Sequence, residues 1–168
     1  MIGINTEDSQ NAVLKLSRMM RYLLYESESG ETQLRSEIEF MNNYIDLMRL
    51  RMSDKVRLKV SFPSKYENLT IPPLLFISII ENAFKHGISY REKSFIDITM
   101  EVSKEFITFR CANSLVTGGP ESSGQHSGIG LENMSKRLNL LYPGRHELKI
   151  DITDSVFNVL VKIALQKA

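Results

Sequence analysis

The sequence has few cysteines and histidines and no long apolar run, which are features that disulfide-linked, zinc-binding and membrane-spanning proteins require. It contains one cysteine, Cys111, and three histidines, which excludes a disulfide framework and argues against zinc sites built on cysteine or histidine clusters. The longest apolar stretch, residues 71–80, is too short to span a bilayer. The N-terminus lacks the basic and then apolar run of a signal peptide. These features predict a chain that works in a reducing, cytoplasmic setting.

An excess of one charge is also missing. Lys and Arg together number 21 and Asp and Glu 20, which gives a net charge of +1. Proteins that bind nucleic acid or anionic lipid favour a basic stripe, so we expect neither partner. The hydrophobic content of 42% and the charged content of 24% are those of a globular protein. The 168 residues suffice for one ordinary domain and a small appendage.

Two amphipathic helices are predicted in residues 1–53. In the first, Val13, Leu16, Met20 and Leu23 recur at helical spacing, and a polar stretch at residues 26–32 predicts a loop after it. The apolar residues of the second helix follow a heptad rhythm: Leu34, Ile38, Met41, Ile45, Met48 and Met52. Two such helices joined by a short loop predict an antiparallel hairpin.

A lone hairpin has too few apolar neighbours to bury both of its seams. Two hairpins related by a two-fold axis would bury them in a four-helix bundle, so we expect a homodimer through these helices. The alternative is that the hairpin packs on its own downstream domain.

Residues 54–168 predict an α+β domain. Alternating apolar residues indicate strands at 56–62, 96–102, 107–111, 148–152 and 157–163. One helix is expected from Pro72 to His86, with its prolines in the first turn, and another around residues 131–141. A loop rich in glycine and serine covers 114–127. Grouped strands and few helices favour a mostly antiparallel sheet covered on one face by helices.

Two features of this domain suggest chemistry. Ser78, Asn82 and Lys85 or His86 form one polar stripe on an otherwise apolar helix, with Glu81 at its edge. Such a stripe either lines a cavity that holds water, an ion or a ligand, or is the solvent face of the helix.

The second feature is Gly128-Ile129-Gly130-Leu131, which stands between the glycine-rich loop and a helix. Glycines and free N–H groups at a helix start suit phosphate oxygens. Asn133 and Arg137 could add polar contacts, or could equally be surface residues.

Together these motifs resemble the LytS-type sensor histidine kinases. Their ATP-binding domain has the Bergerat fold, an α/β sandwich with a mixed, mostly antiparallel sheet. The resemblance covers nearly the whole chain, including a helical segment that belongs to the dimerisation region of that family. The matching strings are Pro72-Pro73-Leu74-Leu75, residues 81–87, residues 128–133 and Arg137-Leu138.

The resemblance implies roles for individual residues. Asn82 would hold Mg²⁺ against the ATP phosphates, the glycines would present backbone amides to them, and residues 114–127 would form a lid. The implied chemistry is transfer of the γ-phosphoryl group to a histidine, for relay to a response regulator. The implied nucleotide-binding set is Asn82, Lys85, His86, Asn113, Gly128, Ile129, Gly130, Leu131, Asn133 and Arg137.

The chain departs from this family in two places. The family's Asp-Asn-Gly box aligns with Ala112-Asn113-Ser114, so the carboxylate that reads adenine is missing. Asn113, Asp97 or a water molecule would have to replace it. The acceptor-histidine box is also absent, because His126 falls in the predicted lid and His146 at a strand start. We therefore expect a fragment with no catalytic residue beyond nucleotide positioning, from a parent protein with sensor and membrane parts.

The sequence thus predicts the catalytic region of a sensor histidine kinase, using ATP and Mg²⁺, with a partial dimerisation segment at residues 1–53. The alternative is a degenerate nucleotide-binding domain or a non-catalytic dimerising scaffold. A kinase of the anti-sigma-factor type shares the fold but fits the heptad hairpin less well.

Overall fold

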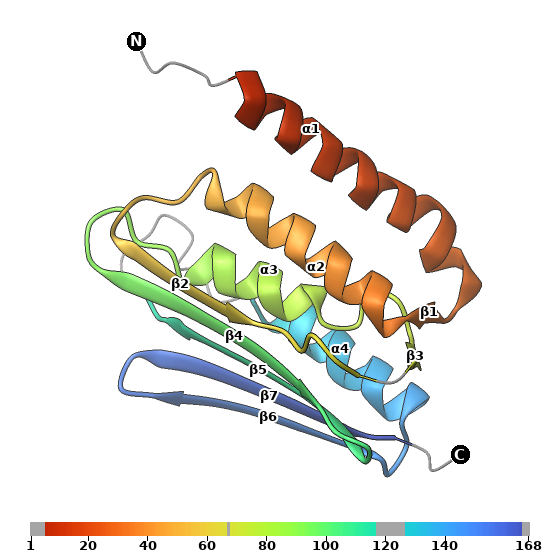
Figure 1. Cartoon of the computed structure of the whole chain (residues 1–168). Helices are drawn as coiled ribbons and strands as arrows, with labels where there is room; N and C mark the ends of the chain where they lie inside the picture. Colours follow the sequence, from red (N-terminus) through yellow and green to blue (C-terminus); the bar gives the residue numbers. More distant parts are fainter. Residues whose placement is uncertain (1–5, 67, 117–126, 166–168) are drawn as a thin grey trace. The chain divides into compact units, whose positions relative to one another are not determined.

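The computed structural model describes residues 6–66, 68–116 and 127–165 (Figure 1). His126 and most of the predicted lid fall outside these ranges. The chain divides into two compact units, which are described separately below. The helical unit comprises Met1–Met52 and Glu67–Leu75, and the sheet unit comprises Ser53–Tyr66 and Phe76–Ala168.

The helical unit is built on two antiparallel helices, α1 (Thr6–Arg21) and α2 (Leu34–Arg49), which lie side by side (Figure 1). Acidic residues in the first turn of α1 and basic residues in its last turn complement the helix dipole. A π-helical turn at Tyr22–Glu26 and a 3-10 turn at Ser27–Ser29 end α1. Gly30, with φ of 77°, then reverses the chain.

The two helices bury their apolar faces to different extents. On α2 the side chains of Leu34, Ile38, Met41 and Ile45 are buried, as the heptad rhythm predicts. The helix ends at Arg49, so Met52 lies beyond it. On α1 and the π-helical turn after it, the apolar side chains are largely exposed: Val13, Leu14, Leu16, Met20, Leu23 and Leu24.

A short antiparallel pair of strands joins residues 67–75 to this unit. Strand β1 (Thr32–Gln33) pairs with β3 (Thr70–Ile71), and the N–H of Leu34 donates to the carbonyl of Leu69 at 2.8 Å. The segment that follows was predicted to be the first turn of a helix from Pro72, and this was wrong.

Helix α3 begins only at Ile77 and runs to His86. Leu74 has φ of 58°, which is incompatible with a right-handed helix. The N–H groups of Leu74 and Leu75 are also engaged elsewhere, because both donate to the carboxylate of Glu37. The two prolines therefore precede the helix instead of opening it.

The sheet unit contains a five-stranded sheet in the order β2-β4-β5-β7-β6. Strand β2 is parallel to β4, and every other pairing is antiparallel. Helices α3 and α4 (Ser127–Leu141) cover one face of the sheet (Figure 1). The predicted α+β class is thus confirmed. The strands are β2 (Val56–Ser61), β4 (Ser94–Val102), β5 (Phe106–Ser114), β6 (His146–Thr153) and β7 (Val156–Ala164).

The core of this unit consists of alternate residues of the central strands, because successive side chains of a strand point to opposite faces. The rings of Phe76 and Phe109 stack within it at a centroid distance of 4.7 Å. The hairpin between β6 and β7 turns at Asp154 and Ser155, both with positive φ, between the strands predicted at 148–152 and 157–163. The completely buried strand residues are Ile96, Ile98, Ile107, Phe109, Val161 and Ile163.

Among the described residues, no helix is both long and apolar enough to cross a membrane.

Candidate nucleotide-binding site

Helix α3 presents one polar face and one buried face. Ile79, Ile80 and Ala83 are almost fully buried and anchor the helix in the sheet unit. Asn82 lies on the polar face and is half-buried, so its amide can be reached from outside. The rest of the predicted stripe lies along the same face, with Ser78 and His86 half-buried and Glu81 and Lys85 exposed.

Glu81 is the carboxylate next to Asn82. Although its side chain is exposed overall, neighbouring atoms partly desolvate the carboxyl group, and this raises the pKa of Glu81. Within the described ranges, no three His, Cys, Asp or Glu side chains are grouped as metal ligands. Any cation held by Asn82 would therefore need most of its ligands from a bound anion and water, which is how Mg²⁺ is commonly held beside phosphates.

The C-terminal end of α3 lies directly against strand β5. A Cβ atom on Gly87 would stand 2.6 Å from the carbonyl oxygen of Ala83 and 2.8 Å from the Cβ of Asn113. Both distances are shorter than real Cβ contacts, so a residue with a side chain would push the helix end off the strand. Gly87 has an ordinary φ of −92°, so close approach is the reason for glycine here.

Strand alternation decides which residue of the Ala112-Asn113-Ser114 box faces α3. Asn113 shares the inward face of β5 with Cys111 and is 1% exposed. Ala112 points to the opposite face, where it pairs with Asp97 of β4. Asn113 is therefore the box residue beneath the helix end, and Asp97 lies on the wrong face to replace it.

The amide of Asn113 has a defined orientation. Its Nδ2 donates to the carbonyl oxygen of Ser114 at 2.9 Å, and a carbonyl can only accept. Oδ1 is therefore the atom left to accept a hydrogen bond. It is an acceptor on the face of β5 that lies against α3, whereas the aligned carboxylate position, Ala112, points to the other face.

Helix α4 brings the glycine-containing segment to its own first turn. Gly128 and Ile129 lie in that turn, and Gly130 is exposed, with no described atom within 4 Å of where a Cβ would stand. Packing among the described residues therefore does not require glycine at position 130. Leu131 is buried with Met134 and Leu138, so its side chain belongs to the core and only its backbone is available to a ligand.

Asn133 is exposed on α4 and Arg137 is half-buried, and the two lie one helical turn apart. The structure thus brings the α3 residues and Asn113 together through Gly87. Helix α4 packs against α3, but the hydrogen bonds and ion pairs described here do not join its polar residues to Asn82.

Sequence reasoning missed two features of this site. Gly87 is the C-cap of α3, but its close contact with Asn113, which excludes other residues, was not foreseen. The box was aligned with Ala112 as its key position. The alternation of Ile107, Phe109 and Cys111 already indicated that the next inward residue is Asn113.

The fold defines the class of protein. The structure matches the catalytic domain of the histidine kinase ThkA with a TM-score of 0.56, at 15% sequence identity, over 80% of this chain and 94% of that domain. Residues 1–56 match the family model described as histidine kinase. The chain therefore contains a domain with the histidine-kinase catalytic fold.

The resemblance to the LytS-type sensor kinases is also confirmed. The chain is 28% identical to the sensor protein LytS of Streptococcus mutans over 178 residues, covering 99% of this chain. It is 27% identical to the sensor histidine kinase/phosphatase LytS of Staphylococcus aureus over 168 residues, covering 92%. The chain spans only about 30% of the length of these relatives, 30% of the first and 29% of the second.

Proposed function

We propose that this chain is the ATP-binding catalytic region of a LytS-type sensor histidine kinase. It transfers the γ-phosphoryl group of ATP to a histidine outside these 168 residues, and the phosphoryl group then passes to a response regulator. The observation that carries the proposal is the placement of Asn113 beneath the end of α3, with Oδ1 available as an acceptor beside the helix that bears Asn82.

Each group in the proposed site has a chemical role. Asn82 would supply an amide oxygen, a ligand type that Mg²⁺ accepts, and the cation would neutralise phosphate charge there. Lys85 and His86 lie one turn further along α3 and bring positive charge or a donor toward the nucleotide. The backbone amides at residues 128–131 meet phosphate oxygens at the start of α4. Asn133 and Arg137 add polar contacts from the next turns of that helix.

Asn113 takes the place of the missing carboxylate in base recognition. Its Oδ1 accepts a hydrogen bond from the exocyclic amino group of adenine. Guanine and hypoxanthine carry a carbonyl oxygen at the same ring position, which would meet Oδ1 as acceptor against acceptor. An amide accepts less strongly than an ionised carboxylate, so we expect weaker adenine binding than a carboxylate would give.

The decisive experiment is calorimetric titration of the chain with a non-hydrolysable ATP analogue, with and without Mg²⁺. We expect saturable binding that depends on Mg²⁺ and is lost in Asn82→Ala. Asn139→Ala is the matched control, because Asn139 is an exposed residue of α4 whose side chain donates to the Ser135 carbonyl of the same helix. The same titration with the inosine analogue should show weaker binding, and the difference should shrink in Asn113→Ala.

Absence of binding at millimolar nucleotide would contradict the kinase and favour the non-catalytic scaffold. If the acceptor histidine lies outside these residues, the isolated chain should not phosphorylate itself on histidine. Labelled ATP that marked one of its own histidines would contradict that part.

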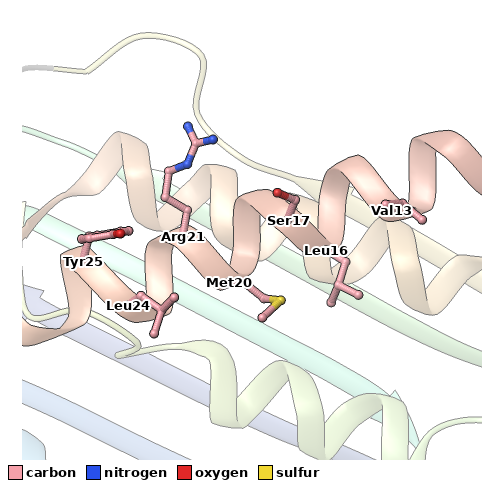
Figure 2. Close-up of a pocket in the computed structure, with 7 residues that line it drawn as sticks. All are labelled: Val13, Leu16, Ser17, Met20, Arg21, Leu24 and Tyr25. Carbon is pink, nitrogen blue, oxygen red and sulfur yellow. The ribbon is translucent and has the colours of Figure 1, made fainter.

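A homodimer belongs to the same proposal. The exposed apolar side chains of α1 border a groove of about 370 Å³ lined only by residues of α1 and the turn after it (Figure 2). A second copy of the hairpin would cover this surface, as in a four-helix bundle. We further propose that the parent protein is held in a membrane by parts outside this chain. The lining residues are Val13, Leu16, Ser17, Met20, Arg21, Leu24 and Tyr25.

A further inference from the structure

A fully buried carboxylate stands at the start of α2. Glu37 is 0% exposed, and the donors to its two oxygens include two backbone N–H groups and one hydroxyl. Oε2 accepts from the N–H of Leu74 and Oε1 from the N–H of Leu75, each at 3.0 Å. The hydroxyl of Tyr22 donates to Oε2 as well. We call these four residues the carboxylate latch.

Three separate segments of the helical unit meet in the latch. Tyr22 lies in the π-helical turn directly after α1, Glu37 in the first turn of α2, and Leu74 and Leu75 in the segment after β3. The Tyr22 ring stacks on Phe40 at a centroid distance of 4.7 Å, which fixes its hydroxyl. Burial and then the Glu37 carboxylate raise the pKa of Tyr22, so the phenol keeps its proton and remains a donor.

The latch holds the backbone in a conformation that it would otherwise leave. Leu74 has φ of 58°, a left-handed conformation that is unfavourable for a residue with a side chain. Removing the carboxylate would take away the acceptor that these two N–H groups share. The strained residue and the carboxylate therefore depend on each other.

The residues held by the latch lead directly into α3. Leu75 is followed by Phe76, whose carbonyl oxygen accepts the first helical hydrogen bonds, from Ile79 at 3.1 Å and from Ile80 at 3.4 Å. Leu74 and Leu75 thus stand directly before the first hydrogen-bonded turn of α3. Asn82 lies on that helix, five residues after its first residue, Ile77.

We propose that Glu37 is a positioning residue for the nucleotide site, which acts through the backbone of Leu74 and Leu75 on the start of α3. Because Tyr22 donates to the same carboxylate, the start of α3 is tied to the end of α1. A merely stabilising role explains the latch less well, since burying a carboxylate carries a desolvation cost that an apolar residue would avoid. The consequence for nucleotide binding rests on the function proposed above, whereas the consequence for α3 does not.

Two substitutions test the latch. Glu37→Gln keeps the size of the side chain but turns one oxygen into an NH₂ group that faces a backbone N–H. Tyr22→Phe keeps the stacking on Phe40 and removes only the hydroxyl, so it carries the test if the glutamine variant does not fold. Ile45→Ala is the control, because Ile45 is buried on the same helix about two turns beyond Glu37 and lowers stability without touching the latch.

The first measurement is amide hydrogen exchange by NMR, without nucleotide, on each variant that folds. We expect Glu37→Gln to raise the exchange rates of Leu74 and Leu75 and also those of Ile79 and Ile80, by about tenfold or more. Tyr22→Phe should change the same amides in the same direction by less, and Ile45→Ala should leave Ile79 and Ile80 near their wild-type rates. Faster exchange confined to Leu74 and Leu75 would overturn the proposal.

The second measurement is the Kd for the Mg²⁺ complex of the ATP analogue. We expect it to rise about fivefold or more in Glu37→Gln and less in Tyr22→Phe, with no change in Ile45→Ala. Unchanged affinity despite a frayed α3 would overturn the positioning role. If the wild-type chain binds no nucleotide, the proposed function fails, and the exchange rates of Ile79 and Ile80 still decide whether the latch sets the start of α3.

Discussion

Helices α1 and α2 are both sixteen residues long and both amphipathic, yet the apolar face of α2 is buried and that of α1 is exposed. On α2, Met41 is 0% exposed and Ile45 is 1% exposed. On α1, Val13 is 66% exposed and Met20 is 54% exposed. Amphipathicity therefore shows that a helix has an apolar face to bury, without showing whether its own chain buries it. Among the described residues, none covers the apolar face of α1 well enough to bury it.

The largest effect is expected from a matched pair of methionines. Met41→Ala should lower the free energy of unfolding by about 2–5 kcal/mol, because it removes a fully buried side chain and leaves a cavity. Met20→Ala should change it by less than about 0.5 kcal/mol, because most of that side chain is already in water. Urea unfolding at a concentration low enough to keep the chain monomeric measures both. Equal losses would break the contrast between the helices.

A charge in the α1 groove should act on association instead. We expect Met20→Glu to weaken self-association by about tenfold or more, or about 1.4 kcal/mol, because dimerisation would bury an unpaired carboxylate. The control is Asn11→Glu, an exposed position half a turn around the same helix, which adds the same charge away from the groove. Sedimentation velocity over a range of concentrations gives the association constants. A wild-type chain that stays monomeric at high concentration would mean that α1 needs a different cover.

A smaller effect on stability is expected from a buried side chain of the sheet unit, the thiol of Cys111. Burial, and after it the charge of Asp97, raises the pKa of the Cys111 thiol from 9.0 to about 12. As the pH rises, the thiol therefore loses its proton in the unfolded chain before it does so in the folded chain. Its contribution to the free energy of unfolding is complete below pH 9 and is lost between pH 9 and 12. At pH 10 the loss is about 1.4 kcal/mol.

The measurement is the difference in unfolding free energy between pH 7.5 and pH 10 for the wild type and for Cys111→Ala. Other groups that titrate in this range are common to both chains and cancel. If the two chains lose the same stability, the thiol is better solvated than the 2% exposure of Cys111 indicates.

Most of the sheet unit could be predicted because local patterns determine it. Period-two alternation located the strands, and the turn at Asp154 and Ser155 falls where polar residues interrupt two apolar runs. The inward position of Asn113 was also present in the alternation of β5. It was missed because the box alignment pointed to Ala112.

The first turn of α3 could not be predicted in the same way. Two prolines favour a helix start, and local propensity contains nothing that opposes it. The opposing group is the carboxylate of Glu37, which lies 37 and 38 residues before the two N–H groups that it accepts. Contacts of that separation depend on the folded structure, as does the exposure of α1.

The pairing of β1 with β3 has a consequence for the order in which the chain can fold during synthesis. Thr32 and its partner Ile71 are separated by helix α2 and by strand β2, which belongs to the sheet unit. A ribosome must therefore release residues of the sheet unit before the helical unit can close. A nascent chain that stops near residue 53 carries both long helices but lacks the strand that closes the first unit, so we expect the hairpin to become fully protease-resistant only after residue 75 has emerged.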